Sequence, residues 1–277
     1  MHVSAPAATL VCCGLIGTIV ADDGLVERAF TEAIATQGIV PGTSAFARCM
    51  AQVHRNRGQR AGDVMSGLFP ENHARGQAAQ LAFERSFGAA VDRMGVSAVP
   101  GATQCVAELA SAGVRVCVVS DLASRSLKLV LDVIGWRPVI DLALSADEVD
   151  RGSPMPDLLL SVMLRQKITD VRDLVLADCT GDGVLAGRRA GAGVVVGVLT
   201  GPHSAERLRQ AGATQVIASI AELSEIVISR RDAGRPAATS APATGQLAVP
   251  APGASLPGMP SGSGSLPGIV EAPRPGL

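Results

Sequence analysis

Hydrophobic and polar positions alternate between two patterns from residue 9 to residue 232. Short apolar runs, often of β-branched residues, predict strands at 9–16, 114–120, 139–144, 174–178 and 194–199, with a short sixth strand at 215–218. Segments with the apolar spacing of helices lie between them, at 102–112, 124–134, 156–166, 183–190, 205–211 and 220–228. This alternation is typical of an α/β fold, a Rossmann-like parallel sheet covered by helices on both faces.

The segment 22–99 has a different pattern. Helical spacing recurs at 25–36, 43–53, 64–68 and 73–93, and no run in this segment has the pattern of a strand. We therefore predict a helical cap domain at 22–99, inserted after the first strand into a core domain made of 1–21 and 100–232.

Residues 233–277 contain mainly Ala, Pro, Gly and Ser and almost no charge. This composition buries too little apolar surface to offset the entropy lost on ordering, so we predict a disordered tail. The alternative interpretation is a flexible tether or a docking segment for Pro-binding modules.

Composition indicates a soluble, cytoplasmic protein. The chain has 277 residues, 47% of them hydrophobic, and a net charge of -1. The uncharged run at 5–21 lacks a basic start, so we expect a buried strand there and not a signal peptide, and no membrane span is expected. Six cysteines without CxxC spacing predict buried thiols. An aromatic content of 2% and the near-neutral charge argue against nucleic-acid binding.

Several motifs occur in a fixed order along the predicted core. A strand that ends at Ser120, a Gly-x-Pro-x-Pro segment at 152–156 and an acidic loop at 178–182 follow the helical insertion. Together with the segments 22–30, 82–85, 100–102 and 185–201, they resemble the haloacid dehalogenase superfamily, and most of all its phosphonatase-like branch. This resemblance spans about residues 8 to 230 and implies the capped Rossmann-like fold of that superfamily.

The resemblance also implies chemistry that the first motif of this chain lacks. Active members carry a nucleophilic aspartate and an acid/base aspartate where this chain has Gly14 and Ile16. Neither residue can attack phosphorus or transfer a proton. The cation of the third motif is replaced by Ser153, and Arg151, two residues earlier, is the candidate substitute.

Other implied site residues are retained. Thr18 in the Gly-Thr turn and Ser120 are candidates to bind a phosphoryl oxygen, although Ser120 is equally suited to cap the turn before Asp121. Asp178 and Asp182 match magnesium ligands of the superfamily, and a site without an aspartate at position 14 would bind the ion weakly. The interpretation we favour is that Asp178 and Asp182 cap the helix at 183–190.

Two features of the predicted cap bear on chemistry. Ala61 lies where phosphonatases carry an imine-forming lysine, and the only lysines are Lys128 and Lys167 in the core, so an imine route is not expected. A run of basic residues indicates a solvated face or, alternatively, a docking surface for an anionic ligand, an acidic protein or nucleic acid: Arg48, His54, Arg55, Arg57 and Arg60.

The sequence therefore predicts a haloacid dehalogenase-like protein that has lost catalysis and acts as a binding or regulatory pseudoenzyme. Its ligand would be a protein partner or a small anion, no cofactor is expected, and self-association into a homo-oligomer is open. The alternative is a magnesium-dependent hydrolase of phosphate esters or phosphonates, rebuilt from Asp178, Asp182, Ser120 and Arg151.

Overall fold

The structure is a computed structural model that describes residues 10–234. Residues 1–9 and 235–277 lie outside this range, and with them lies almost all of the predicted tail. The last two described residues of that tail segment belong to the final helix.

Six strands form one parallel sheet in the order β3-β2-β1-β4-β5-β6, which confirms the predicted fold class. They are β1 (Leu10–Gly14), β2 (Arg115–Ser120), β3 (Leu142–Ser145), β4 (Leu174–Asp178), β5 (Val194–Val198) and β6 (Gln215–Ile217). The first strand is central and completely buried, pairing with β2 on one side and β4 on the other. The connections reverse direction across β1, so the carboxyl ends of β1, β2 and β4 meet at one edge of the sheet.

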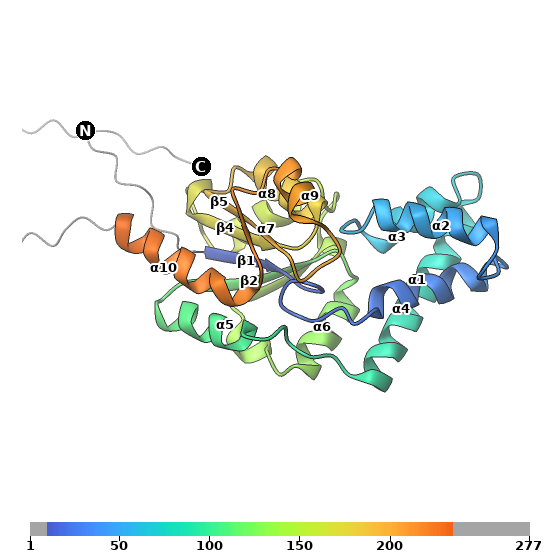
Figure 1. The fold of residues 1–277 in the computed structure, drawn as a ribbon, viewed down its shortest axis with the longest axis horizontal. Helices are drawn as coiled ribbons and strands as arrows, with labels where there is room; N and C mark the ends of the chain where they lie inside the picture. The colour runs from blue at the N-terminus through green and yellow to red at the C-terminus, as the bar shows by residue number, and fades with distance from the viewer. Residues whose placement is uncertain (1–9, 235–277) are drawn as a thin grey trace, which may run out of the picture. The chain divides into compact units, whose positions relative to one another are not determined.

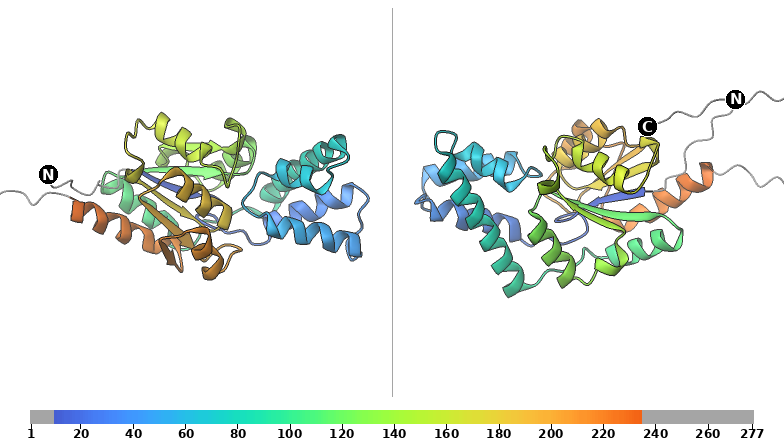
Figure 2. Two further views of the ribbon diagram at one scale, coloured as in Figure 1. Left: turned by 90° about the horizontal axis from the view of Figure 1, so that it is seen from above. Right: turned by 180° about the vertical axis from the view of Figure 1, so that it is seen from behind.

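Helices cover both faces of this sheet (Figure 1, Figure 2). On one face Val11 and Cys13 of β1 pack with α5 (Ala102–Ser111), α6 (Ser124–Val133) and α10 (Leu223–Gly234). On the other face Leu10 and Cys12 pack with α7 (Asp157–Arg165), α8 (Gly181–Ala190) and α9 (Ala205–Ala211). Successive residues of β1 thus serve opposite cores, which explains why the whole strand is apolar.

Two predicted strand limits are wrong by two or three residues, while the others lie within one residue of the described strands. The third strand begins at Leu142 because Arg137–Val139 forms a 3-10 turn that contains a proline. The first strand ends at Gly14, and the backbone then turns, with the amides of Gly17 and Thr18 bonded to the carbonyls of Val20 and Leu15. Three more 3-10 turns lie at Ala146–Glu148, Val171–Asp173 and Ile220–Glu222.

Four helices lie between β1 and α5 in the sequence, as the apolar spacing predicts. They are α1 (Leu25–Thr36), α2 (Ser44–Arg55), α3 (Ala61–Leu68) and α4 (His73–Met94), and we name them the cap helices. Phe83 of α4 packs against Phe30 of α1 and against Phe87, with ring centroids 4.5 and 6.1 Å apart. This aromatic core joins the longest cap helix to the first.

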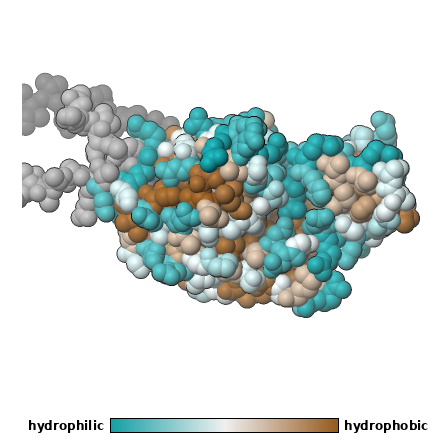
Figure 3. Space-filling view, viewed as in Figure 1, coloured by the Kyte–Doolittle hydropathy of each residue, from teal (hydrophilic) through white to brown (hydrophobic). Residues whose placement is uncertain are grey.

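The surface is mixed and the thiols are largely buried. On the face seen in Figure 3, hydrophilic residues are interspersed with several hydrophobic areas, one of them beside α10. All six cysteines are free, and only Cys49 is half-buried while the other five are buried. Among the helices of residues 10–234, none combines the length and the apolar character needed to cross a membrane.

Candidate functional site

A cavity of about 90 Å³ lies where the carboxyl ends of β1, β2 and β4 meet. Its wall combines the turn after β1, the end of β2, the end of β4 and the loop between α2 and α3, through residues that include Gly14, Ile16, Thr18, Ser120, Asp121, Asp178, Thr180, Arg57, Gly58 and Gln59. A second cavity of about 20 Å³ shares Ser120, Asp121 and Asp178 and adds Ser153. We name the two together the pocket.

Gly14 lies at the carboxyl edge of the sheet, at the position where active members of the superfamily carry the nucleophilic aspartate. A Cβ atom on Gly14 would lie 2.5 Å from Oδ2 of Asp178 and 2.9 Å from Oγ1 of Thr18. The carboxylate of Asp178 therefore occupies the space that a side chain at position 14 needs. Ile16, the second missing reagent, lines the same cavity with an apolar side chain.

Asp178 is buried and is held in place by its neighbour Thr180. Its Oδ1 accepts hydrogen bonds from the backbone N–H and the hydroxyl of Thr180, both at 2.7 Å. Burial raises the pKa of Asp178 to about 6, and the hydrogen bonds from Thr180 offset part of this effect.

The two aspartates do not supply the predicted side-chain cap of the helix, although Asp182 lies in its first turn, where a negative charge complements the helix dipole as predicted. Thr180 is the cap residue of α8, because its hydroxyl accepts a hydrogen bond from the N–H of Gly183 at 3.1 Å. Asp178 orients that cap residue, because its Oδ1 accepts a hydrogen bond from the Thr180 hydroxyl. Asp182 lies in the first turn of α8, where its Oδ2 accepts a hydrogen bond from Nε2 of Gln59 at 2.7 Å.

Asp121 is a site residue that the sequence analysis did not single out. It is half-buried, lines both cavities and accepts a hydrogen bond from the backbone N–H of Ser153 at 3.2 Å. Burial, followed by the nearby charge of Asp178, raises the pKa of Asp121 to about 7. The signal was its place directly after the last residue of β2, at the edge where the strands of this sheet end.

Ser120 and Thr18 are both buried. The hydroxyl oxygen of Ser120 accepts a hydrogen bond from the N–H of Leu122 at 3.2 Å, which is the predicted turn-capping role, and the same residue lines both cavities. Thr18 ties the turn after β1 to β4, because its Oγ1 accepts a hydrogen bond from the N–H of Cys179 at 3.1 Å. Both hydroxyls thus hold the framework of the pocket.

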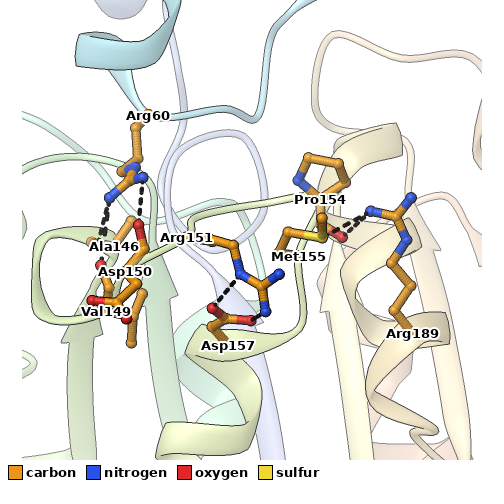
Figure 4. A network of polar contacts seen from close by, with 9 residues as sticks. All are labelled: Arg60, Ala146, Val149, Asp150, Arg151, Pro154, Met155, Asp157 and Arg189. Atoms are coloured by element: carbon orange, nitrogen blue, oxygen red, sulfur yellow. Dashed lines mark hydrogen bonds and ion pairs between the residues drawn. The ribbon is translucent and has the colours of Figure 1, made fainter.

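The structure does not bring Arg151 to the pocket, which corrects its predicted role as the substitute cation. Its guanidinium donates two hydrogen bonds to the carboxylate of Asp157, both at 2.9 Å, and its side chain is 61% exposed (Figure 4). Asp157, in the first turn of α7, offers Arg151 a bidentate partner on the surface. Ser153 lines the second cavity and supplies no charge there.

Two arginines of the predicted solvated run instead face the core. The guanidinium of Arg57 pairs with Asp22 at 2.5 Å, and the Arg57 side chain is only 12% exposed. Arg60 donates to the carbonyl of Asp150 at 2.9 Å and to those of Ala146 and Val149 at 3.4 Å (Figure 4). For these two residues the solvated face is the wrong interpretation, while Arg48 and Arg55 are exposed as predicted.

The loop that carries Arg57 and Arg60 also touches the start of α8. Gly58 has a φ of +98°, and a Cβ atom there would lie 2.5 Å from Oγ1 of Thr180. Only glycine allows this backbone to approach so closely. Together with the bond from Gln59 to Asp182, this contact closes one side of the pocket.

The residues present do not fit the magnesium site that the resemblance implies. Magnesium needs several oxygen ligands in octahedral geometry. Position 14 supplies none, Oδ1 of Asp178 is bonded to Thr180, and Asp182 is bonded to Gln59. Within residues 10–234 no three His, Cys, Asp or Glu side chains group closely enough to hold a metal ion.

Comparison with known proteins relates the sequence of this chain to a family of hydrolases. The model of the family described as haloacid dehalogenase-like hydrolase matches residues 17–197. Phosphonoacetaldehyde hydrolase of Pseudomonas aeruginosa is 34% identical over 96 residues, which are 34% of each chain. The bifunctional riboflavin kinase/FMN phosphatase of Arabidopsis thaliana is 30% identical over 110 residues, which are 39% of this chain and 28% of the relative. The chain thus spans about a third of the length of these curated relatives.

Solved structures share the fold over most of the chain. A phosphonoacetaldehyde hydrolase-like protein from Oleispira antarctica has a TM-score of 0.71 and 19% identity, over 83% of this chain and 95% of that one. CbbY from Rhodobacter sphaeroides, solved in complex with phosphate, has a TM-score of 0.66 and 19% identity, over 78% of this chain and 96% of that one. At such identities the likeness concerns the fold alone.

Proposed function

Because this chain belongs to the haloacid dehalogenase-like hydrolase family, we propose that it keeps the pocket of that family without its phosphoryl chemistry, and that it acts by binding. The observation that carries this proposal is the filled space at position 14. The carboxylate of Asp178 lies 2.5 Å from the Cβ atom that Gly14 lacks. A nucleophilic side chain has neither an atom nor room there.

The absence of an acid/base group at position 16 and of a cation at position 153 supports the same proposal. Ile16 lines the pocket with a side chain that cannot carry a proton. Arg151 does not replace the cation missing at Ser153, because it is bound to Asp157 on the surface, and Arg57, which lines the pocket, is paired with Asp22. Three losses together remove much more of a catalytic advantage than one, since such groups act as a unit.

We propose that the ligand is a small molecule bound in the pocket. The alternative ligand is a protein partner. We further propose that the cap helices form a separate domain and that the protein works in the cytoplasm. Cleavage of a phosphonate through an imine is not part of the proposal. Ala61 is buried at the start of α3, and Lys128 lies on α6, outside the residues that line the pocket.

A turnover assay tests the loss of chemistry. The full chain, mixed with magnesium and a panel of phosphate esters and phosphonoacetaldehyde, is expected to release no phosphate above the background of Asp178→Asn. A matched variant with Gly14→Asp, Ile16→Asp and Ser153→Arg tests whether the fold still accommodates the two aspartates and the cation of active family members. Turnover by the natural chain that Asp178→Asn abolishes would contradict the proposal.

A second candidate function is a hydrolase with a rebuilt site, and one observation favours it. The pKa values of Asp121 and Asp178, about 7 and about 6, lie in the range where a carboxyl group exchanges protons at neutral pH. Such an enzyme would lose turnover in Asp121→Asn and keep it in the control Asp157→Asn, whose carboxylate lies outside both cavities.

A further inference from the structure

The loop between β5 and α9 carries a histidine that faces the start of α8. Nδ1 of His203 accepts a hydrogen bond from the backbone N–H of Gly181 at 2.7 Å, and His203 is half-buried. An imidazole nitrogen that accepts a hydrogen bond carries no proton, so the single ring proton lies on Nε2. The contact therefore requires the neutral form of His203.

This hydrogen bond gives α8 an acceptor that the helix itself lacks. Gly181 is the first residue of α8, and the first N–H groups of a helix have no acceptor within the helix. The hydroxyl of Thr180 caps the N–H of Gly183, so His203 and Thr180 satisfy different amides of the same turn. His203 thereby ties the loop after β5 to the loop after β4.

The loop that His203 ties down also contributes to the pocket wall. Pro202, the preceding residue, lines the larger cavity. Oγ1 of Thr200 donates a hydrogen bond to the carbonyl of Gly17 at 2.7 Å, so the loop is attached to the turn after β1 as well. Of these two attachments, only the one through His203 contains a group that titrates near neutral pH. Its loss would free the segment that carries Pro202 on the side of α8.

Most groups that face the imidazole ring oppose its protonation. A proton on Nδ1 would place an N–H against the N–H of Gly181, at the end of α8 where the helix dipole is positive. Burial, followed by the charge of Arg207 on α9, lowers the pKa of His203 from its ordinary value of 6.5. Arg57, in the loop between α2 and α3, acts in the same direction, and Asp182 in the first turn of α8 acts in the opposite one.

Going beyond the proposed function, we propose that His203 is a pH-sensitive latch of the pocket wall, which holds the loop 199–204 against α8 when neutral and releases it when protonated. The direction follows from the acceptor role of Nδ1. The hydrogen bond is intact above pH 6.5 and is lost as pH falls through the lowered pKa of His203. The latch acts on the chain without ligand, so it is the same for a pocket that binds and for one that hydrolyses.

Nitrogen NMR of the histidine rings in the full chain tests the first step. At about pH 7.5 His203 is expected to be the tautomer with its proton on Nε2. Its titration midpoint is expected below 6.5. A proton on Nδ1 at about pH 7.5, or a midpoint above 6.5, would overturn the proposal.

Amide hydrogen exchange, corrected for the intrinsic effect of pH, measures the release. Protection of the peptides 181–184 and 199–204 should fall about fivefold or more between about pH 7.5 and about one pH unit below the NMR midpoint. Asp121 and Asp178 titrate in part of this range. The decisive quantity is therefore the difference between the natural chain and a variant without a titrating group at position 203.

His203→Asn is that variant, because its amide oxygen takes the place of Nδ1 and cannot be protonated near neutral pH. Its protection in both peptides should equal that of the natural chain at about pH 7.5 and exceed it about fivefold at the lower pH. His203→Ala, without an acceptor, should lack this protection at both pH values. His54→Asn changes an exposed histidine of α2 and should keep the full pH response.

Two exchange results would overturn the latch. One is a pH response of His203→Asn equal to that of the natural chain, and the other is natural-chain protection that stays constant through the His203 midpoint. The Asn variant carries the test, since it keeps the hydrogen bond and with it the local fold. Phosphate release in the turnover assay would contradict the proposed function and leave these exchange results unchanged.

Discussion

At the scale of single residues, position 14 shows how a neighbour fills the space of a missing side chain. Gly14→Ala adds one methyl group that meets Oδ2 of Asp178 at 2.5 Å and Oγ1 of Thr18 at 2.9 Å. Thr18 Oγ1 accepts a hydrogen bond from Cys179, and the carboxylate of Asp178 is held through its Oδ1 by Thr180, so we expect the free energy of unfolding to fall by about 1–3 kcal/mol. Urea denaturation measures this change.

The matched control is Gly88→Ala. Gly88 lies within α4, and the atom nearest to an added Cβ there is 4.0 Å away. Alanine favours a helix over glycine by up to about 1 kcal/mol, so this variant should be as stable as the natural chain or more stable. Equal loss of stability in both variants would show that the fit around Gly14 is not tight.

The carboxyl group of Asp121 makes stability depend on pH. Its pKa rises from 3.8 to about 7 on folding, so the folded chain binds more protons than the unfolded chain between these values. The stability that protonation supplies is therefore present at low pH and lost as pH rises through this window. Relative to Asp121→Asn, the natural chain should lose roughly 1–3 kcal/mol of unfolding free energy between about pH 5 and pH 8.

Asp157 supplies the control for this pH dependence. Its hydrogen bonds and ion pair with Arg151 lower its pKa, so its contribution to stability disappears only when pH falls below the ordinary carboxyl range. Between pH 5 and pH 8 the difference between the natural chain and Asp157→Asn should stay constant. A curve for Asp121→Asn that runs parallel to the natural one would contradict the raised pKa.

Residue identity predicts what the pocket lacks better than what it contains. Gly14 and Ile16 lie at the carboxyl end of the first strand as predicted, because the buried apolar strand pairs in a fixed register with β2 and β4. The pairing of Arg151 with Asp157 depends on the conformation of the loop between them, which no periodicity encodes. Asp121 was missed for the same reason, since its direction follows from the turn after β2.

At the scale of elements, the start of α8 joins a helix cap to the pocket. Thr180→Ala removes the hydroxyl that accepts a hydrogen bond from the N–H of Gly183 and donates one to Oδ1 of Asp178. We expect a loss of about 1–2 kcal/mol in unfolding free energy, as for other Thr caps. The pKa of Asp178 should rise further, because the hydroxyl that stabilises its charged form is gone.

Thr43→Ala is the control for the cap. Thr43 accepts a hydrogen bond from the N–H of Phe46 in an exposed turn at the start of α2, and no ionisable group takes part in that bond. Its removal should also destabilise the protein and leave the pKa of Asp178 unchanged by carboxyl NMR. A shift in both variants would mean that the pKa reports general loosening.

The strands were predictable because β1, β2, β4 and β5 are buried on both faces and form continuous apolar runs. Periodicity fails where an apolar run continues past the hydrogen-bonded strand. Val139 and Ile140 extend the apolar pattern of the third strand, yet the backbone there is still leaving a 3-10 turn. The true start at Leu142 is set by pairing with β2.

At the scale of the whole described chain, Arg60 links the cap helices to the loop 146–150. Arg60→Ala removes three hydrogen bonds to backbone carbonyls of that loop. We expect faster amide hydrogen exchange in 146–150 and in the loop 57–60, because both lose their mutual contact. Mass spectrometry of deuterium uptake measures this effect.

Arg55→Ala belongs to the same charged run and tests for a general effect of charge. Its side chain is exposed at the end of α2, so exchange in 146–150 should match that of the natural chain. The sequence does not separate these two arginines, because both have the same charge and nearly the same position. Only the path of the chain between α2 and α3 turns one toward the core.

The filled space beside β1 makes the order of mutations decisive. An aspartate introduced at position 14 collides with Asp178 unless that carboxylate first leaves Thr180, which in turn disturbs the cap of α8. The two positions are therefore expected to be epistatic, so an acid at position 14 should cost less stability when residue 178 has already been changed.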